Sequence, residues 1–138
     1  MKIRECEKAD LDEILKIEEA SFEYPYSRST FVRYLTEDFI LVSENEKGRL
    51  TGYIIGKRRG KNGFIVSIAV DPTHRRQGIG SSLMKEIQRE IDTKRIWLIV
   101  RISNVRARSF YSELGYIKVD VIKDYYQDDE NGLLMINK

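Results

Sequence analysis

The segment from Ile65 to Ser81 constrains the fold of this chain more than any other. It begins with a run rich in β-branched residues, Ile65 to Val70, which predicts a strand ending at Asp71-Pro72. A short basic loop follows, and two glycines, Gly78 and Gly80, precede an amphipathic helix. The apolar stripe of that helix is formed by Ile79, Leu83, Ile87 and Ile91. A strand, a glycine-containing turn and a helix in this order predict an α/β fold.

The turn between this strand and helix has the properties of an anion site. A helix N-terminus presents unpaired N–H groups and a partial positive charge. Gly78 and Gly80 carry no side chains, so a diphosphate can approach those N–H groups, and Arg75 and Arg76 add charge at the rim. The loop has no Gly-Lys-Ser/Thr, and Leu98 stands where a dinucleotide-binding fold needs an acidic residue. The pattern therefore predicts a phosphate-binding turn that is neither a Walker loop nor the turn of a dinucleotide-binding fold.

The remaining sequence predicts a mixed sheet with helices on both of its faces. Asp10 is the expected N-cap of the first helix, with Glu13 in the capping-box position, and Ser27 is the expected cap of the second. Pro25 separates these two helices. The expected strands are 2–6, 39–43, 50–57, 63–70, 95–101, 116–123 and 132–137. The expected helices run over about 10–20, 27–35, 78–92 and 104–114, which gives the order β-α-α-β-β-β-α-β-α-β-β.

Composition limits the classes of function. A length of 138 residues without a linker or repeat predicts one domain, residues 1–138. The net charge of +2, from 24 basic and 22 acidic side chains, argues against nucleic acid as a partner. No apolar run reaches the roughly 20 residues that cross a bilayer, so no membrane partner is expected. The single cysteine, Cys6, and the lack of a secretory signal fit a cytoplasmic protein.

The turn also carries a family resemblance. The run Arg75-Arg76-Gln77-Gly78-Ile79-Gly80 resembles the Arg/Gln-x-x-Gly-x-Gly/Ala signature of GNAT acetyltransferases. Three further runs resemble the branch of that family that acetylates protein N-termini: Val100-Arg101-Ile102-Ser103-Asn104, Phe110 to Tyr116, and Tyr125-Tyr126. The resemblance spans nearly the whole chain. It implies a GNAT-type mixed, largely antiparallel sheet, acetyl-CoA as co-substrate and no metal.

The resemblance assigns cofactor contacts residue by residue. The backbone of Ile68, Ala69 and Val70 matches the strand that pairs with the pantetheine arm, and the Val70 N–H matches the oxyanion donor. Asn104 matches a cofactor contact, although a plain helix N-cap is an equally simple interpretation of it. The residues expected around the pyrophosphate are Arg75, Arg76, Gln77, Gly78, Ile79, Gly80 and Ser81.

The same resemblance suggests how protons move. Tyr111 matches the tyrosine beside the leaving sulfur, and a phenol with a pKa of about 10 can protonate a thiolate of similar basicity; its alternative is a core aromatic. The family's usual bases fall at Ile99 and Phe64, which accept no proton. Glu23 is the candidate base, with an ordinary surface carboxylate as the alternative. The one histidine, His74, is interpreted as a loop residue.

The missing base favours an α-amine as acceptor. Such an amine has a pKa of about 7.7–8.0, so a substantial part of it is neutral near pH 7.4, whereas a lysine at about 10.4 is almost fully charged. Protein or peptide N-termini, including ribosomal or nascent-chain N-termini, are the expected substrates. A small-amine or amino-acid acetyltransferase and a catalytically impaired acyl-CoA-binding module remain as alternatives. The residues expected to line the acceptor groove are Phe22, Glu23, Tyr24, Tyr26, Tyr125 and Tyr126.

Overall fold

A computed structural model describes residues 1–137 as a seven-stranded sheet covered by four helices. The strand order is β1-β2-β3-β4-β5-β7-β6, and every neighbouring pair is antiparallel except β4 and β5. The strands are β1 (Lys2–Glu5), β2 (Phe39–Glu44), β3 (Leu50–Arg59), β4 (Asn62–Val70), β5 (Arg95–Arg101), β6 (Tyr116–Ile122) and β7 (Gly132–Asn137). The helices are α1 (Leu11–Ser21), α2 (Arg28–Glu37), α3 (Ile79–Ile91) and α4 (Val105–Glu113). This order confirms the predicted one.

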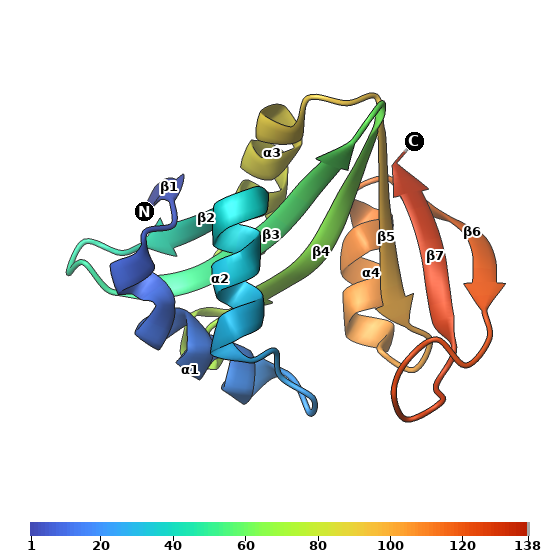
Figure 1. The fold of residues 1–138 in the computed structure, drawn as a ribbon, viewed down its shortest axis with the longest axis horizontal. Coiled ribbons are helices and arrows are strands. Elements are labelled where there is room, and N and C mark those ends of the chain that lie inside the picture. Colours follow the sequence, from blue (N-terminus) through green and yellow to red (C-terminus); the bar gives the residue numbers. More distant parts are fainter. Residues whose placement is uncertain (138) are drawn as a thin grey trace.

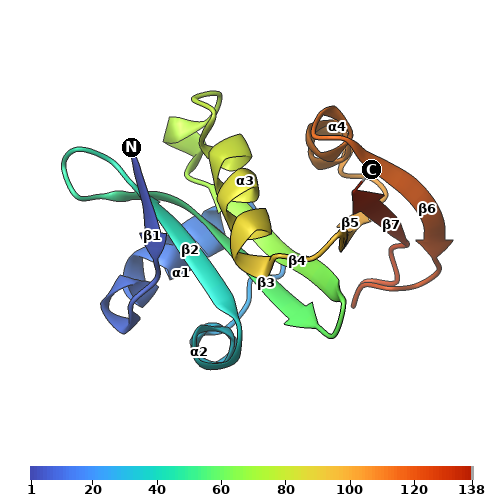
Figure 2. The ribbon, with the colours of Figure 1, turned by 90° about the horizontal axis from the view of Figure 1, so that it is seen from above.

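The helices lie on both faces of the sheet, as predicted. Helices α1 and α2 cover one face, and α3 and α4 cover the other (Figures 1 and 2). Each face has its own apolar core: Phe31 and Tyr53 are fully buried on the first, and Leu83 and Ile87 on the second. No helix within residues 1–137 is both long enough and apolar enough to cross a membrane.

The start of α1 differs from the prediction. Asp10 precedes the helix, but its carboxylate accepts the N–H of Glu7 at 2.7 Å and pairs with Arg4 at 2.8 Å. The capping box therefore lies one turn earlier, around a short 3-10 turn at Lys8–Asp10. Glu13 is not part of a box, because its carboxylate accepts the N–H of Leu50 at 3.1 Å and ties α1 to β3. The expectation of an Asp10–Glu13 capping box is wrong.

The segment between α1 and α2 follows the predicted turn chemistry. The hydroxyl of Ser27 accepts the N–H of Thr30 at 3.3 Å and caps α2. Residues 22–27 are therefore a loop that leaves α1 at Ser21 and includes Pro25. This acceptor loop, residues 22–27, lies at the end of the sheet where β4 and β5 separate (Figure 1).

The two parallel strands β4 and β5 pair over only half of their length. Asn62 to Ile65 pair with Arg95 to Leu98, and beyond that point β5 pairs only with β7. A β-bulge marks the same place on β4: Ser67 faces Ile55 and Ile65 faces Gly56, which leaves Val66 as the extra residue. The bulge bends β4 away, and the strands diverge as a V (Figure 1).

Candidate active site

A cavity of about 750 Å³ occupies the V between β4 and β5. The last five residues of β4, the end of β5, the start of α3, helix α4 and the acceptor loop form its walls. Most of the predicted site residues meet there, although they come from distant parts of the sequence. The predicted residues lining the cavity are Phe22, Glu23, Tyr24, Tyr26, Ile68, Ala69, Val70, Arg75, Arg76, Gly78, Ile79, Gly80, Ser81, Asn104, Tyr111 and Tyr126.

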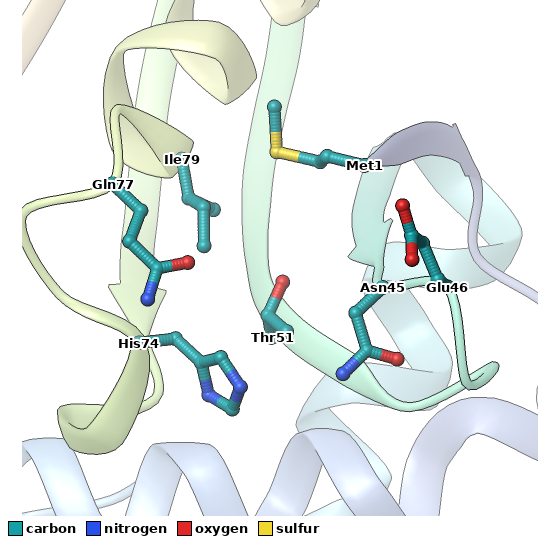
Figure 3. Close-up of a pocket in the computed structure, with 7 residues that line it drawn as sticks. All are labelled: Met1, Asn45, Glu46, Thr51, His74, Gln77 and Ile79. Atoms are coloured by element: carbon teal, nitrogen blue, oxygen red, sulfur yellow. The ribbon is translucent and has the colours of Figure 1, made fainter.

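Two predicted site residues lie elsewhere. Gln77 points into a separate pocket of about 170 Å³ (Figure 3). This pocket lies between the phosphate turn, residues 75–81, and the β2–β3 hairpin, and His74 and Thr51 also line it. Tyr125 is 49% exposed and packs edge-on against Tyr126, with ring centres 4.9 Å apart. Neither side chain lines the large cavity, so any contact of theirs with a substrate must be made at its rim.

The phosphate turn has the geometry of an anion site. Arg76 and Gly78 both adopt positive φ, 66° and 75°, and α3 begins directly afterwards at Ile79. The first intrahelical bond runs from the Ser82 N–H to the Gly78 carbonyl at 3.1 Å, so the N–H groups of residues 79–81 have no partner within the helix. Left-handed residues before a helix N-terminus form a concave array of N–H donors. The side chain of Ile79 is buried, and only its backbone serves this array.

The edge of β4 that faces the cavity offers backbone hydrogen bonds. Residues 67–70 pair with β3 on one side, and on the other side residues 66–70 face the cavity rather than β5. An extended chain with amide groups can therefore add to this edge as a strand would. The pantetheine arm of acetyl-CoA has such amides, and a diphosphate at its end meets the α3 N-terminus. The residues present fit this co-substrate.

Helix α4 brings two predicted residues to the opposite wall. The side chain of Asn104 accepts the Ala107 N–H at 3.1 Å, which confirms its helix-cap interpretation, and it also lines the cavity. Tyr111 is 8% exposed and packs against Phe110 and Tyr116 at 5.4 and 6.2 Å. Burial raises the pKa of the Tyr111 phenol, so the group is protonated at neutral pH and is a weaker acid than the ordinary phenol expected from the sequence.

Arg101 joins the two loops at the acceptor end. Its guanidinium lies over the rings of Tyr126 and Tyr24, at 4.2 and 5.5 Å from their centres. The same group pairs with Asp128 and Glu130 at 2.9 Å. The hydrogen bonds that Asp128 and Glu130 accept are the main reason why the pKa values of both carboxyls are lowered. One side chain from β5 therefore links the acceptor loop to the β6–β7 loop. The sequence motif around Arg101 was recognised, but this contact role was not predicted.

Carboxylates near the acceptor end differ in their surroundings. Ile99 lines the cavity and cannot accept a proton, and Glu23 is exposed. Glu18 was missed by the sequence analysis: it lines the same cavity but is only 2% exposed. Helical periodicity could have found it, because Glu18 lies four residues after Ile14 and seven after Leu11, on the buried face of α1.

The phosphate turn and the open edge of β4 together suit a ligand that carries a diphosphate on an extended, amide-containing arm. Residues 11–116 match the sequence profile described as Acetyltransferase (GNAT) family. The chain belongs to this family, and acetyl-CoA is its acyl donor.

Similar proteins are found among archaea and eukaryotes. An N-acetyltransferase of Methanocaldococcus jannaschii, described as uncharacterized, is 37% identical over all of this chain and 92% of its own length. An N-alpha-acetyltransferase of Sulfurisphaera tokodaii is 33% identical over 97% of this chain and 90% of its own. The crystal structure of Chaetomium thermophilum Naa20 with a bisubstrate analogue superposes with a TM-score of 0.91 at 26% identity, covering 99% of this chain and 86% of that one.

Proposed function

We propose that this enzyme transfers the acetyl group of acetyl-CoA to the α-amino group of a protein or peptide N-terminus. The observation that carries the proposal is the shape of the cavity. It runs from the phosphate turn, along the open edge of β4, to walls formed by Tyr24, Tyr26 and Tyr126. Acetyl-CoA enters from the turn and a peptide end from between the loops, so the two substrates meet at the V.

The two ends of the cavity suit ligands of opposite charge. The cofactor end has the N-terminus of α3 with Arg75 and Arg76, which favours a diphosphate. The acceptor end has Glu18 and Glu23 beside the C-terminal turn of α1, where helix carbonyls carry a partial negative charge. A peptide N-terminus arrives as an ammonium group, and this end favours a cation.

The chemistry needs one proton donor at the sulfur. The amine attacks the thioester carbonyl, the carbon–sulfur bond breaks, and the electron pair goes to sulfur. Tyr111 is assigned as the donor that protonates this thiolate, because its phenol is in the cavity wall and protonated at neutral pH; burial weakens it as an acid, but a thiolate formed in the same desolvated wall is made more basic as well. Backbone N–H groups of β4, with that of Val70 as the assigned donor, stabilise the oxyanion that precedes cleavage, an effect worth about 3 kcal/mol.

Relatives support the choice of acceptor. The Sulfurisphaera tokodaii relative is named an N-alpha-acetyltransferase, and the Naa20 structure was solved with a bisubstrate analogue. Tyr24 and Tyr126 stand on opposite loops and are held together by Arg101, which gives an extended peptide end two aromatic walls. Nascent-chain and ribosomal-protein N-termini belong to this class of acceptor.

An acetyl-transfer assay over three acceptor panels tests the proposal. The first panel is peptides varied at positions one and two; the second is the same peptides with a blocked α-amine and an internal lysine; the third is polyamines and free amino acids. Transfer to free peptide N-termini alone is expected. Transfer mainly to the third panel would establish the small-amine alternative, and acetyl-CoA binding without any transfer would establish the impaired module.

A further inference from the structure

The carboxylate of Glu18 is buried in the wall of the cavity without a cation. Charged side chains are seldom this buried unless they are paired. Two other carboxylates with little exposure follow that rule, because Asp10 pairs with Arg4 and Asp38 pairs with Arg59, each at 2.8 Å. None of the ion pairs formed within residues 1–137 includes Glu18. A buried carboxylate that lacks a cation and borders a ligand cavity is suited to a cationic ligand.

Two neutral donors hold this carboxylate in place. The Tyr26 N–H donates to one Glu18 oxygen at 2.8 Å, and the Tyr53 hydroxyl donates to the other. An ionised carboxylate has about four acceptor positions, so these two bonds leave room for further donors. The tyrosine hydroxyl and the loop backbone therefore fix the direction of the group and leave it able to accept from a ligand.

A polar atom on the same helix as Glu18 lacks a hydrogen-bond partner. The hydroxyl of Ser21, one turn further along α1, is buried and is the one such side-chain atom without a hydrogen bond in the part of the chain described. Ser21 lines the same cavity. An ammonium group has three N–H donors, and the carboxylate of Glu18 and the hydroxyl of Ser21 supply acceptors for them.

We propose that Glu18 receives the α-ammonium group of the acceptor and removes the proton that must leave before the amine attacks. The inference rests on the proposed function. One nitrogen–hydrogen bond breaks and an oxygen–hydrogen bond forms on Glu18, and the freed lone pair makes the new carbon–nitrogen bond. A second proton leaves the nitrogen as the amide forms and, through solvent, replaces the proton that Tyr111 gives to the sulfur. The proton returns from Glu18 to solvent after the product leaves.

Burial drives this transfer in the required direction. An ammonium and a carboxylate lose much more hydration free energy in a desolvated site than a neutral amine and a carboxylic acid do. Moving the proton removes both charges, so the low-dielectric wall favours the reactive amine. Burial also raises the pKa of the Glu18 carboxyl, which brings its basicity closer to that of the amine.

Other titratable groups act on the same site and must be separated from Glu18. Tyr53 of β3 and Tyr26 of the acceptor loop contact it directly. Glu23 is the competing base suggested by the sequence. The remaining titratable or charged side chains on the cavity walls are Tyr24, His74, Arg75, Arg76, Arg101, Arg106, Tyr111, Glu113 and Tyr126.

The deciding experiment measures kcat/KM against pH for Glu18→Gln, with the exposed neighbour Glu19→Gln as the matched control and Glu23→Gln as the test of the competing base. Glutamine keeps one oxygen to accept the Tyr26 N–H, and its NH2 group can donate to the Tyr53 hydroxyl, but it takes no proton. At pH 7, Glu18→Gln should lower kcat/KM about a hundredfold. The deficit should shrink above about pH 8, where the α-amine loses its proton unaided. The acetyl-CoA dissociation constant should not change, the Glu19→Gln control should follow the wild type, and Glu23→Gln should not show the pH-dependent deficit.

A second variant keeps the inference testable if Glu18→Gln does not fold. Tyr53→Phe removes a hydrogen bond that favours the charged carboxylate, so the acidic limb of the pH profile should move to higher pH. Any one of three results would overturn the inference. These are a kcat/KM of Glu18→Gln that is lowered equally at every pH, a kcat/KM of that variant equal to the wild type, or a pH-dependent deficit in Glu23→Gln instead. If wild-type enzyme acetylates no peptide, the proposed function fails, and the same profiles on the amine it does acetylate decide the role of Glu18.

Discussion

Gly80 of α3 lies against the ring of Phe110 of α4: a Cβ placed on Gly80 would stand 3.1 Å from Phe110 Cζ. This contact joins the helix that offers the diphosphate its N–H groups to the helix that carries Asn104 and Tyr111. Glycine at this position therefore serves two purposes. It leaves the N–H groups accessible, and it lets the two helices close on each other across the cavity.

Gly80→Ala should lower the free energy of unfolding by about 1–3 kcal/mol, because the added methyl overpacks the contact with Phe110. Gly80→Leu should in addition abolish acetyl-CoA binding, since the larger side chain fills the phosphate turn. Thermal unfolding and calorimetry measure the two effects. Adding Phe110→Leu to Gly80→Ala should recover most of the lost stability; a Gly80→Ala enzyme as stable as the wild type would show that the contact does not constrain the helices.

Tyr111→Phe should reduce kcat about a hundredfold and leave the dissociation constant of acetyl-CoA nearly unchanged, because it removes only the proton that the thiolate needs. The ring remains, so contacts with Phe110 and Tyr116 are preserved. Steady-state kinetics and calorimetry on the same preparation check this. Full turnover in the variant would remove Tyr111 as the proton donor.

Arg101→Lys should raise KM for the peptide about tenfold and leave KM for acetyl-CoA unchanged. A lysine ammonium cannot stack on two rings and bridge two carboxylates at once, so the loops at the acceptor end should separate. The matched control is Arg59→Lys, which alters an Arg–Asp pair with Asp38 at the end of β3. If both variants affect the peptide KM equally, the link between the loops is not what positions the acceptor.

Much of this fold was predictable because its signals are local. The apolar stripe of α3, the Ser27 cap and the proline between α1 and α2 each depend on a few neighbouring residues. The phosphate turn was predictable for the same reason, because its glycines and arginines are consecutive in sequence.

What the sequence did not predict depends on tertiary contacts. The Asp10–Glu13 capping box failed because Arg4 and the hairpin strand β3 compete for those two carboxylates. The V opens at a bulge at Val66, which no residue pattern marks. Helical periodicity places Glu18 on the buried face of α1, but the hydrogen bond it accepts from Tyr53 comes from the neighbouring strand β3.

The stability of Glu18→Gln should differ from that of the wild type in a pH-dependent way. Because burial raises the pKa of Glu18, the native state binds more protons than the unfolded chain between the unfolded pKa of about 4.3 and the folded one. Protonation of Glu18 therefore stabilises the wild type at low pH, and this part of its free energy of unfolding is lost as the pH rises through that window. Glutamine does not titrate, so the free energy of unfolding of the variant lacks this pH dependence. Urea unfolding from pH 4 to 8 should show the variant gaining relative stability toward neutral pH; parallel curves would contradict the burial of an ionisable carboxyl.

A titration of isotope-labelled protein with CoA, followed by amide NMR, tests the central claim most directly. The account predicts saturable binding, with the largest shifts at the amides of residues 76–81 and along residues 66–70 of β4. Absence of binding, or shifts concentrated in the small pocket around Gln77 and Thr51 instead, would contradict it.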